Sequence, residues 1–102
     1  MDFTVFLSPE ALHDLESIVA YVAPHNPAAA ERLGNQLLDA AFSLANLPER
    51  GRVVPEFRLP DLREIIFRSY RVIYRVSTKD KSVEIARFWH AARGFPQIPR
   101  AL

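Results

Sequence analysis

The sequence predicts an α+β fold with the element order β-α-α-β-β-β, in which a helical hairpin packs on one face of a small, mainly antiparallel sheet. Two segments in the first half place apolar residues at the three- and four-residue spacing of helices. Three segments in the second half, and one short run near the start, are rich in the β-branched and aromatic residues of strands. The 102 residues have the length of one domain, so we predict a single domain over residues 1–102, with residues 94–102 as an extended tail.

A strand followed directly by a helix is predicted at the N-terminal end. Residues 3–7 (FTVFL) are β-branched and aromatic. Ser8 is a residue type that caps helices, and Pro9 fits the first helical turn, where its missing N–H costs nothing. Pro24 must end this helix. The apolar residues that recur on its buried side are Leu12, Leu15, Val19 and Val22. Asp14 is expected away from that side.

A second helix is predicted over residues 28–47, where Asn26 acts as the cap and Pro27 takes the first position. Because few residues separate the two helices, they should form an antiparallel hairpin. Leu38 and Phe42 widen the apolar arc of the second helix beyond what a surface helix needs. We therefore expect this helix to contact both its hairpin partner and the sheet, with Phe42 near the polar boundary.

The second half of the chain is predicted to be a loop followed by three strands. Prolines and a glycine interrupt residues 48–60, which leaves at most a short extended piece around Val53. The strands should cover residues 63–68, 70–77 and 82–90. The polar loop TKDK between the last two strands indicates an antiparallel meander.

The strand over residues 70–77 has two different faces. The residues expected to face the helices are Tyr70, Val72, Tyr74 and Val76. The opposite face carries Arg71 and Arg75, and we predict that it is open and arginine-rich, facing solvent or a partner. The alternative is that these arginines pair across strands with a glutamate, Glu64 or Glu84.

The charge is divided between the two halves of the chain. Residues 1–49 contain seven acids and one base, a net charge of −6, whereas residues 50–102 contain twelve bases and five acids, a net charge of +7. Either the halves pair within the fold, or the second half presents a basic surface to an anionic partner. Ten of the twelve bases are arginine, which favours directional contacts with carboxylate or phosphate.

Composition excludes several classes of site. The chain has no cysteine, so disulfides and thiolate chemistry are excluded, and a reducing compartment is suitable. The three histidines, His13, His25 and His90, lack the spacing of a metal site, and the three glycines are too far apart for a nucleotide loop. We expect no metal and no cofactor. Without a signal peptide or a long apolar run, the protein is expected to be cytoplasmic and to have no membrane partner.

One set of residues has the types that RNA cleavage requires. Attack by the 2′-hydroxyl of RNA needs a base, an acid for the leaving oxygen and cations for the phosphate charge. Glu56, His90 and the arginines have these side chains. Each also has an ordinary alternative, Glu56 as a solvated loop acid and His90 as a half-buried strand end. Trp89, in the segment RFWHAARG, is more often a core or rim residue than a stacking platform.

Several motifs in order resemble a known family. These are LSPEALHDLESIVAYV, the helix with NPAAAERL, then LPERGR, YRVIYRV and VEIARFWHAARG. The set is similar to the ParE/RelE superfamily of toxins from bacterial type II toxin–antitoxin modules, and more closely to its ParE-like branch. The resemblance covers about residues 3–94. It implies a small toxin that a ParD-like antitoxin wraps and inactivates in a hetero-oligomer, and whose target is DNA gyrase, poisoned without turnover of a substrate.

The same resemblance leaves an enzymatic alternative. RelE-like members cut messenger RNA on the ribosome, and some use a Glu, an Arg and a His near the positions of Glu56, Arg63 and His90. Two departures count against this alternative: no lysine lies between Arg50 and Ser77, and the chain reads AARG after His90 instead of an aromatic ending. A second alternative is a non-toxic or retargeted binding module on the same fold.

The resemblance and the charge pattern together nominate two sets of binding residues. The candidates for target binding are Trp89, His90, Arg93, Arg71 and Arg75. The candidates for antitoxin binding are Leu38, Phe42, Arg63 and Arg68.

Overall fold

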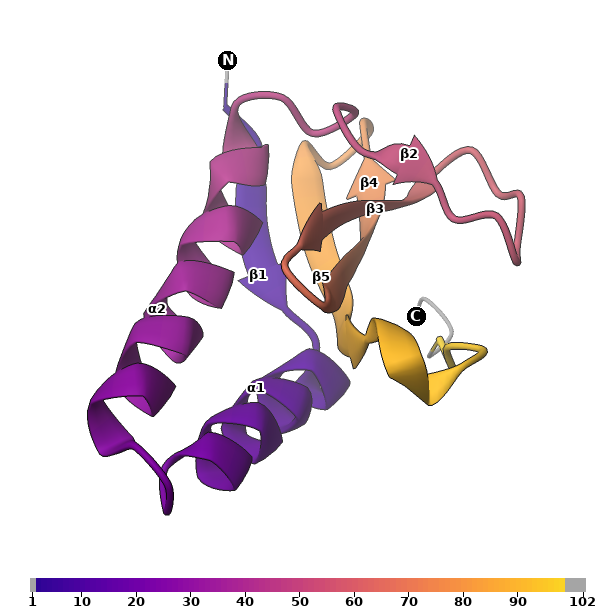
Figure 1. The fold of residues 1–102 in the computed structure, drawn as a ribbon. Helices are drawn as coiled ribbons and strands as arrows, with labels where there is room; N and C mark the ends of the chain where they lie inside the picture. Colours follow the sequence, from indigo (N-terminus) through magenta and orange to yellow (C-terminus); the bar gives the residue numbers. More distant parts are fainter. Residues whose placement is uncertain (1, 99–102) are drawn as a thin grey trace.

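The structure, a computed structural model, describes residues 2–98 and has the α+β architecture that the sequence predicts (Figure 1). Two helices pack on one side of a five-stranded mixed sheet. The elements in chain order are β1 (Thr4–Leu7), α1 (Pro9–Val22), α2 (Pro27–Phe42), the 3-10 turn η1 (Ser43–Ala45), β2 (Arg52–Val53), β3 (Leu62–Phe67), β4 (Tyr70–Ser77), β5 (Ser82–His90) and the 3-10 turn η2 (Ala91–Arg93). Within residues 2–98, no helix has both the length and the apolar character needed to cross a bilayer.

Both predicted helix caps are confirmed. The Ser8 hydroxyl accepts a hydrogen bond from the Ala11 N–H at 3.0 Å, and the Asn26 side-chain oxygen accepts one from the Ala29 N–H at 3.0 Å. The second helix ends at Phe42, five residues before the predicted end. The chain tightens there into η1, and this places the Ala45 carbonyl to accept a hydrogen bond from Phe3 N at 2.9 Å.

The sheet has the strand order β1-β5-β4-β3-β2, in which β1 pairs with β5 in parallel and all other pairs are antiparallel. The first strand of the chain therefore lies beside the last one. The meander of β3, β4 and β5 is as predicted, and β2 is the short extended piece expected around Val53. The sequence does not determine the strand order, because periodicity describes single strands and not their partners.

The helix face of the sheet holds the larger core. The buried side chains of this core come from both helices, η1, β4 and β5: Ala11, Leu15, Leu37, Ala41, Leu44, Val72, Tyr74, Val76, Val83, Ile85 and Phe88. The predicted inward face of β4 is thus confirmed. The helices approach closely at Gly34, where an added Cβ would lie 3.0 Å from a methyl group of Val19.

The opposite face of the sheet is covered, and the prediction of an open arginine-rich face is wrong. Ile73 is fully buried there, in a second cluster with Val54, Leu62, Ala86 and Trp89. Phe57 of the β2–β3 loop and Ile98 of the tail pack against this cluster, and the Phe57 and Phe95 rings meet edge to face at 5.4 Å. Figure 1 shows the loop and the C-terminal segment on the side of the sheet away from the helices. The rest of the predicted tail, residues 99–102, lies outside the described residues.

Candidate functional site

A network of two arginines and two glutamates lies on the covered face. The Arg71 guanidinium donates two hydrogen bonds to Glu56, at 2.8 and 2.7 Å, so both carboxylate oxygens of Glu56 are occupied. Its Nε donates to Glu64 at 2.6 Å, and Arg52 Nε donates to the other oxygen of Glu64 at 2.7 Å. Glu64 is 1% exposed and Arg71 is 8% exposed. The predicted alternative, an arginine paired across strands with Glu64, is confirmed.

The network changes the acid strength of its members. The hydrogen bonds from Arg71 lower the pKa of Glu56 against the opposing effect of burial. The same bonds, with those to Glu64, raise the pKa of Arg71. Arg71 is therefore a permanently charged group whose hydrogen-bonding capacity is used inside the protein. As a target-binding candidate, Arg71 does not project from an open face, because two carboxylates and the covering loop enclose it.

The three candidate catalytic residues lie apart. Glu56 joins Arg71 on the covered face. Arg63 pairs across strands with Tyr74, on the helix face. His90 pairs with Tyr70, which lies four residues before Tyr74 in β4. At about 3.3 Å per residue, four residues correspond to roughly 13 Å along the sheet. The fold therefore does not bring Glu56, Arg63 and His90 to one point.

Arg63 supports the turn before β2. Its guanidinium donates to the Gly51 carbonyl at 2.9 Å and lies 3.5 Å from the Glu49 carbonyl. Gly51 N–H donates to the Tyr74 hydroxyl at 3.0 Å, and burial raises the pKa of Tyr74. An added Cβ at Gly51 would come within 2.4 Å of the Glu64 carbonyl oxygen, so this position requires glycine. These contacts give Arg63 a structural role.

The segment RFWHAARG divides into buried and exposed side chains. Trp89 is 4% exposed, and its indole N–H donates to the Gly94 carbonyl at 3.2 Å. Arg93 is exposed and lies over the Trp89 ring at 4.0 Å from the centroid, with Arg87 at 4.8 Å. Trp89 is thus a core residue that supports Arg93. The remaining target-binding candidate, Arg75, lies 3.9 Å from Glu84 in a cross-strand ion pair.

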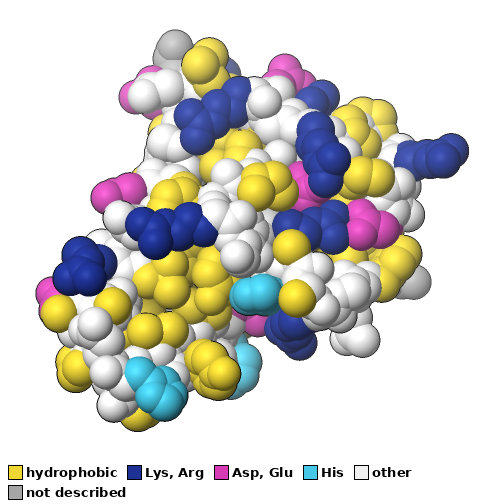
Figure 2. Space-filling model, viewed as in Figure 1, with side chains coloured by type: hydrophobic (Ala, Val, Ile, Leu, Met, Phe, Trp, Pro, Cys, Tyr) yellow, Lys and Arg dark blue, Asp and Glu magenta, His cyan; other side chains and the backbone are white. Residues whose placement is uncertain are grey.

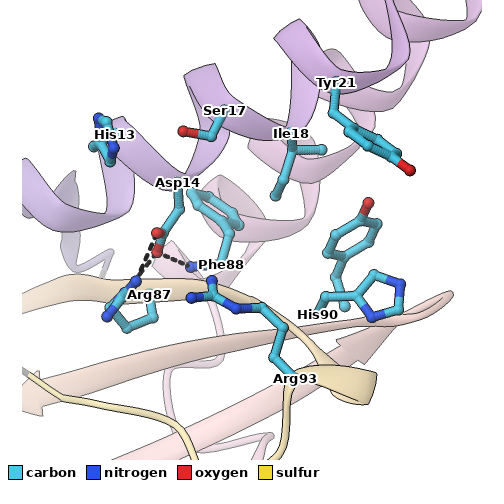
Figure 3. A pocket seen from close by; sticks show the side chains of 10 residues that line it. His13, Asp14, Ser17, Ile18, Tyr21, Arg87, Phe88, His90 and Arg93 are labelled. Atoms are coloured by element: carbon cyan, nitrogen blue, oxygen red, sulfur yellow. Dashed lines mark hydrogen bonds and ion pairs between the residues drawn. The ribbon is translucent and has the colours of Figure 1, made fainter.

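A cleft of about 410 Å³ separates α1 from the end of the sheet (Figure 3). The two oxygens of Asp14 accept hydrogen bonds from Arg87 at 2.6 and 2.7 Å, and one of them also accepts the Phe88 N–H at 3.1 Å. The pairing of β1 with β5 ends at Leu7 and Ile85. Past that point, Asp14 accepts the Phe88 N–H that would otherwise face a neighbouring strand. The residues that line the cleft are His13, Asp14, Ser17, Ile18 and Tyr21 of α1, Tyr70 of β4, Arg87, Phe88 and His90 of β5, and Arg93 of η2.

The sequence reasoning missed this role of Asp14. The side chain was expected to point away from the buried side, but Asp14 is 6% exposed. The spacing of Asp14 does indicate its burial. It lies three residues after the buried Ala11 and four residues before Ile18, so all three share one side of the helix. A carboxylate at such a position indicates a buried cationic partner. Nothing in the sequence names Arg87, 73 residues away, as that partner.

The antitoxin-binding candidates lie in different environments. Leu38 lines an apolar groove of about 450 Å³ between α1 and α2, together with Val19 and Ala20. Phe42 is 50% exposed one helical turn further along α2. Arg68 is exposed in the β3–β4 turn, over the ring of Phe67 at 5.4 Å. Figure 2 shows apolar side chains gathered between the two helices, and several Lys and Arg side chains over the sheet beside Asp or Glu.

The chain matches known toxins in sequence. Residues 5–95 match the family model of the ParE toxin of the type II toxin–antitoxin system parDE. Toxin RelE1 of Caulobacter vibrioides is 36% identical over 92 residues, which are 88% of this chain and 95% of the relative. Toxin RelE2 of the same organism is 42% identical over 83 residues, 81% of this chain and 89% of the relative.

Solved structures share the fold. A chain of the chromosomal ParDE toxin–antitoxin system from P. aeruginosa superposes with a TM-score of 0.72 at 18% identity, over 86% of this chain and 95% of that one. A chain of the toxin–antitoxin complex RelBE2 from Mycobacterium tuberculosis gives 0.68 at 24% identity, over 88% and 99%. With the sequence match over nearly its whole length, the chain belongs to the ParE toxin family, within the ParE/RelE superfamily of type II toxin–antitoxin toxins.

Proposed function

We propose that this toxin acts by binding DNA gyrase and poisoning it, and that a ParD-like antitoxin neutralises it. The observation that carries the proposal is the hydrogen bonding of Glu56, because Arg71 donates to both of its carboxylate oxygens. Glu56 is the candidate base of the alternative, ribosome-dependent cleavage of messenger RNA. Side chains of the types that such cleavage would need are present in the chain, but Glu56 and Arg63 are used in structural contacts.

General acid–base catalysis requires a base that reaches the substrate proton and has a pKa near the working pH. Glu56 meets neither condition in the free protein, because Arg71 occupies its oxygens and lowers its pKa. Arg63 is held by the carbonyls before β2, on the other face of the sheet. This arrangement favours a toxin that inhibits by occupying a surface of its target.

The proposed target surface consists of η2 and the described part of the tail. Arg93 is exposed on the ring of the buried Trp89, which limits its movement. Phe95, two residues later, is 64% exposed. Arginine and aromatic side chains on a rigid support are the residues that most often anchor protein interfaces.

The proposed antitoxin surface is larger and lies mainly on the helices. The groove between α1 and α2 contains Leu38 and is continued by the half-exposed Phe42. An apolar helix or extended segment of the antitoxin would cover this stripe. The basic half of the chain, which includes the exposed Arg68, would pair with acidic residues of the same antitoxin.

Supercoiling assays with purified gyrase test the target. We expect the toxin to inhibit supercoiling and to trap a cleavage complex, and Arg93→Lys to weaken both, because lysine keeps the charge but loses the planar group that stacks on Trp89. Arg32→Lys is the matched control, since Arg32 is exposed on α2, outside the proposed surface. No inhibition at micromolar toxin would refute the gyrase target.

Induction in cells tests the enzymatic alternative. A binding toxin should retain its toxicity with Glu56→Gln and should leave messenger RNA intact in the first minutes. An acid–base enzyme would lose at least roughly a hundredfold in rate with Glu56→Gln or His90→Ala. Messenger RNA cleavage that disappears in either variant, with the fold shown intact by circular dichroism, would replace the gyrase proposal with the ribonuclease.

A further inference from the structure

The groove between α1 and α2 is lined by apolar residues and by two glutamates. Its apolar lining consists of Leu15, Val19 and Ala20 of α1, and Gly34 and Leu38 of α2. Glu16 of α1 and Glu31 of α2 are the charged residues of the lining, and both are exposed. The volume of about 450 Å³ lies in the range of binding pockets. The groove therefore combines an apolar surface with one negative charge on each helix.

The two glutamates have no counter-ion within the described part of the chain. Among residues 2–98, no Lys, Arg or His lies within ion-pair distance of Glu16 or Glu31. Arg32 follows Glu31 in sequence, but it does not line the groove, because successive helical residues point in different directions. A cationic group of a partner is the complement that both carboxylates lack.

The apolar surface continues beyond the groove on both helices. Leu12 lies one helical turn before Glu16 and is 50% exposed, and Phe42 lies one turn after Leu38 and is also 50% exposed. Single exposed apolar residues are ordinary, but a continuous apolar surface on a small protein indicates a site of contact with another molecule. The groove and its two extensions form such a surface.

The groove favours a helix over an extended segment. Its walls are α1 and α2, which run unbroken over 14 and 16 residues, so their backbone groups bond within the helices. An extended segment buried there would leave its own N–H and C=O groups without partners, which is costly. A helix satisfies these groups itself and places its apolar side chains along one side.

We propose that this groove binds an amphipathic helix of the antitoxin, in which Lys or Arg residues flank the apolar side and pair with Glu16 and Glu31. The proposal rests on the antitoxin surface proposed above and specifies its chemistry. The antitoxin is then basic where it meets the helices and acidic where it meets the basic half of the chain. A second copy of the toxin is a poor occupant, because two grooves face to face would bring the unpaired glutamates of both copies together.

Two designed peptides test the groove. Both form the same amphipathic helix with leucines along one side, and the flanking residues are lysine in one peptide and glutamate in the other. Fluorescence anisotropy should show saturable binding of the lysine peptide to the purified toxin. Its affinity should be at least about fivefold higher than that of the glutamate peptide, the size of effect that exposed charge pairs produce. NMR of the 15N-labelled toxin should show shifts at Ala20, Asn35 and Leu38, which line the groove.

Isosteric variants separate the charge of the groove from its shape. Glu16→Gln/Glu31→Gln removes both charges and should bring the affinities of the two peptides to within about twofold of each other. Asp39→Asn is the matched control, because Asp39 is exposed on α2 but does not line the groove, and this variant should keep the preference for lysine. Added salt should reduce the preference of the unchanged toxin, since screening weakens exposed pairs.

Three results would each overturn the proposal: equal affinities of the two peptides for the unchanged toxin, a lysine preference that survives in Glu16→Gln/Glu31→Gln, or shifts that fall on the sheet. A toxin dimer that the lysine peptide dissociates would also overturn it, because a second copy would then be the occupant. A toxin that binds neither peptide but inhibits gyrase refutes this proposal alone. A toxin that binds the lysine peptide without inhibiting gyrase supports the groove and refutes only the proposed target.

Discussion

On the helix face of β4, Val72, Tyr74 and Val76 pack against apolar side chains of α1 and α2. On the other face, Arg71 is buried with Glu64 beneath the β2–β3 loop. Both faces exclude water with apolar side chains, but the second face also buries an ion network. An apolar core tolerates substitutions that conserve its volume, whereas a buried charge is stable only while its partner is present. The two faces should therefore respond differently to the loss of one side chain.

The largest effect is expected from Arg71→Met. This change leaves the carboxylate of Glu64 buried with one remaining partner, the exposed Arg52, and should lower the free energy of unfolding by about 3–5 kcal/mol. Urea denaturation measures the loss. The double variant Arg71→Met/Glu64→Leu should recover most of it, because both buried charges are then gone. If the double variant were no more stable than Arg71→Met alone, the unpaired charge of Glu64 would not be the cause of the loss.

Leu37→Ala tests the helix face. Leu37 is fully buried among the apolar residues of the larger core, and its truncation should cost about 3 kcal/mol through lost burial and the remaining cavity. The volume-conserving Leu37→Met should cost less than about 1.5 kcal/mol. If Leu37→Met were as destabilising as Leu37→Ala, the helix face would lack the tolerance ascribed to it. Thermal and urea unfolding of both variants decide this.

Two glycines allow the same comparison to be made at the backbone, with Gly51 beside the ion network and Gly34 between the two helices. Gly51→Ala should lower the free energy of unfolding by about 1–3 kcal/mol, because the new methyl group meets the Glu64 carbonyl, which cannot move without disturbing the ion network. Gly34→Ala meets a side-chain methyl of Val19 and gains about 1 kcal/mol of helix propensity, so its net effect should be near zero. Equal losses in both variants, measured by thermal unfolding, would contradict this difference.

The smallest effect concerns pH. Because its pKa is lowered in the folded protein, Glu56 contributes stability at pH values above the ordinary glutamate pKa, and this stability is lost as the pH falls through the lower folded pKa. Glu56→Gln should cost about 1 kcal/mol at neutral pH, where the pair with Arg71 is partly exposed, and almost nothing in acid. Urea midpoints of both proteins between pH 3 and 7 provide the measurement. A constant difference across this range would show that the Glu56 charge is not responsible.

The sequence predicts elements well where the signal is local. The two helix caps and the bounds of β4 and β5 follow from residue type and alternation, and all are confirmed. The same alternation cannot tell what covers a face. Arg71 and Arg75 read as solvent-facing residues, because their glutamate partners are identified by the folded structure and not by spacing along the chain. The cleft was missed for the same reason, since its lining residues come from three separate segments.

The pairing of β1 with β5 has a consequence for synthesis on the ribosome. Thr4 to Leu7 find their partners only after residues 82–85 have been made, and the Ser8 hydroxyl bonds to the carbonyl of Ala86, 78 residues later. Contacts at such sequence separation form late, since a long loop must close before they contribute. A nascent chain that stops within the β4–β5 turn lacks β5, the strand that joins β1 to the rest of the sheet, so partial products should not present the folded surfaces of the toxin. Its antitoxin then has nothing to recognise until the last strand is in place.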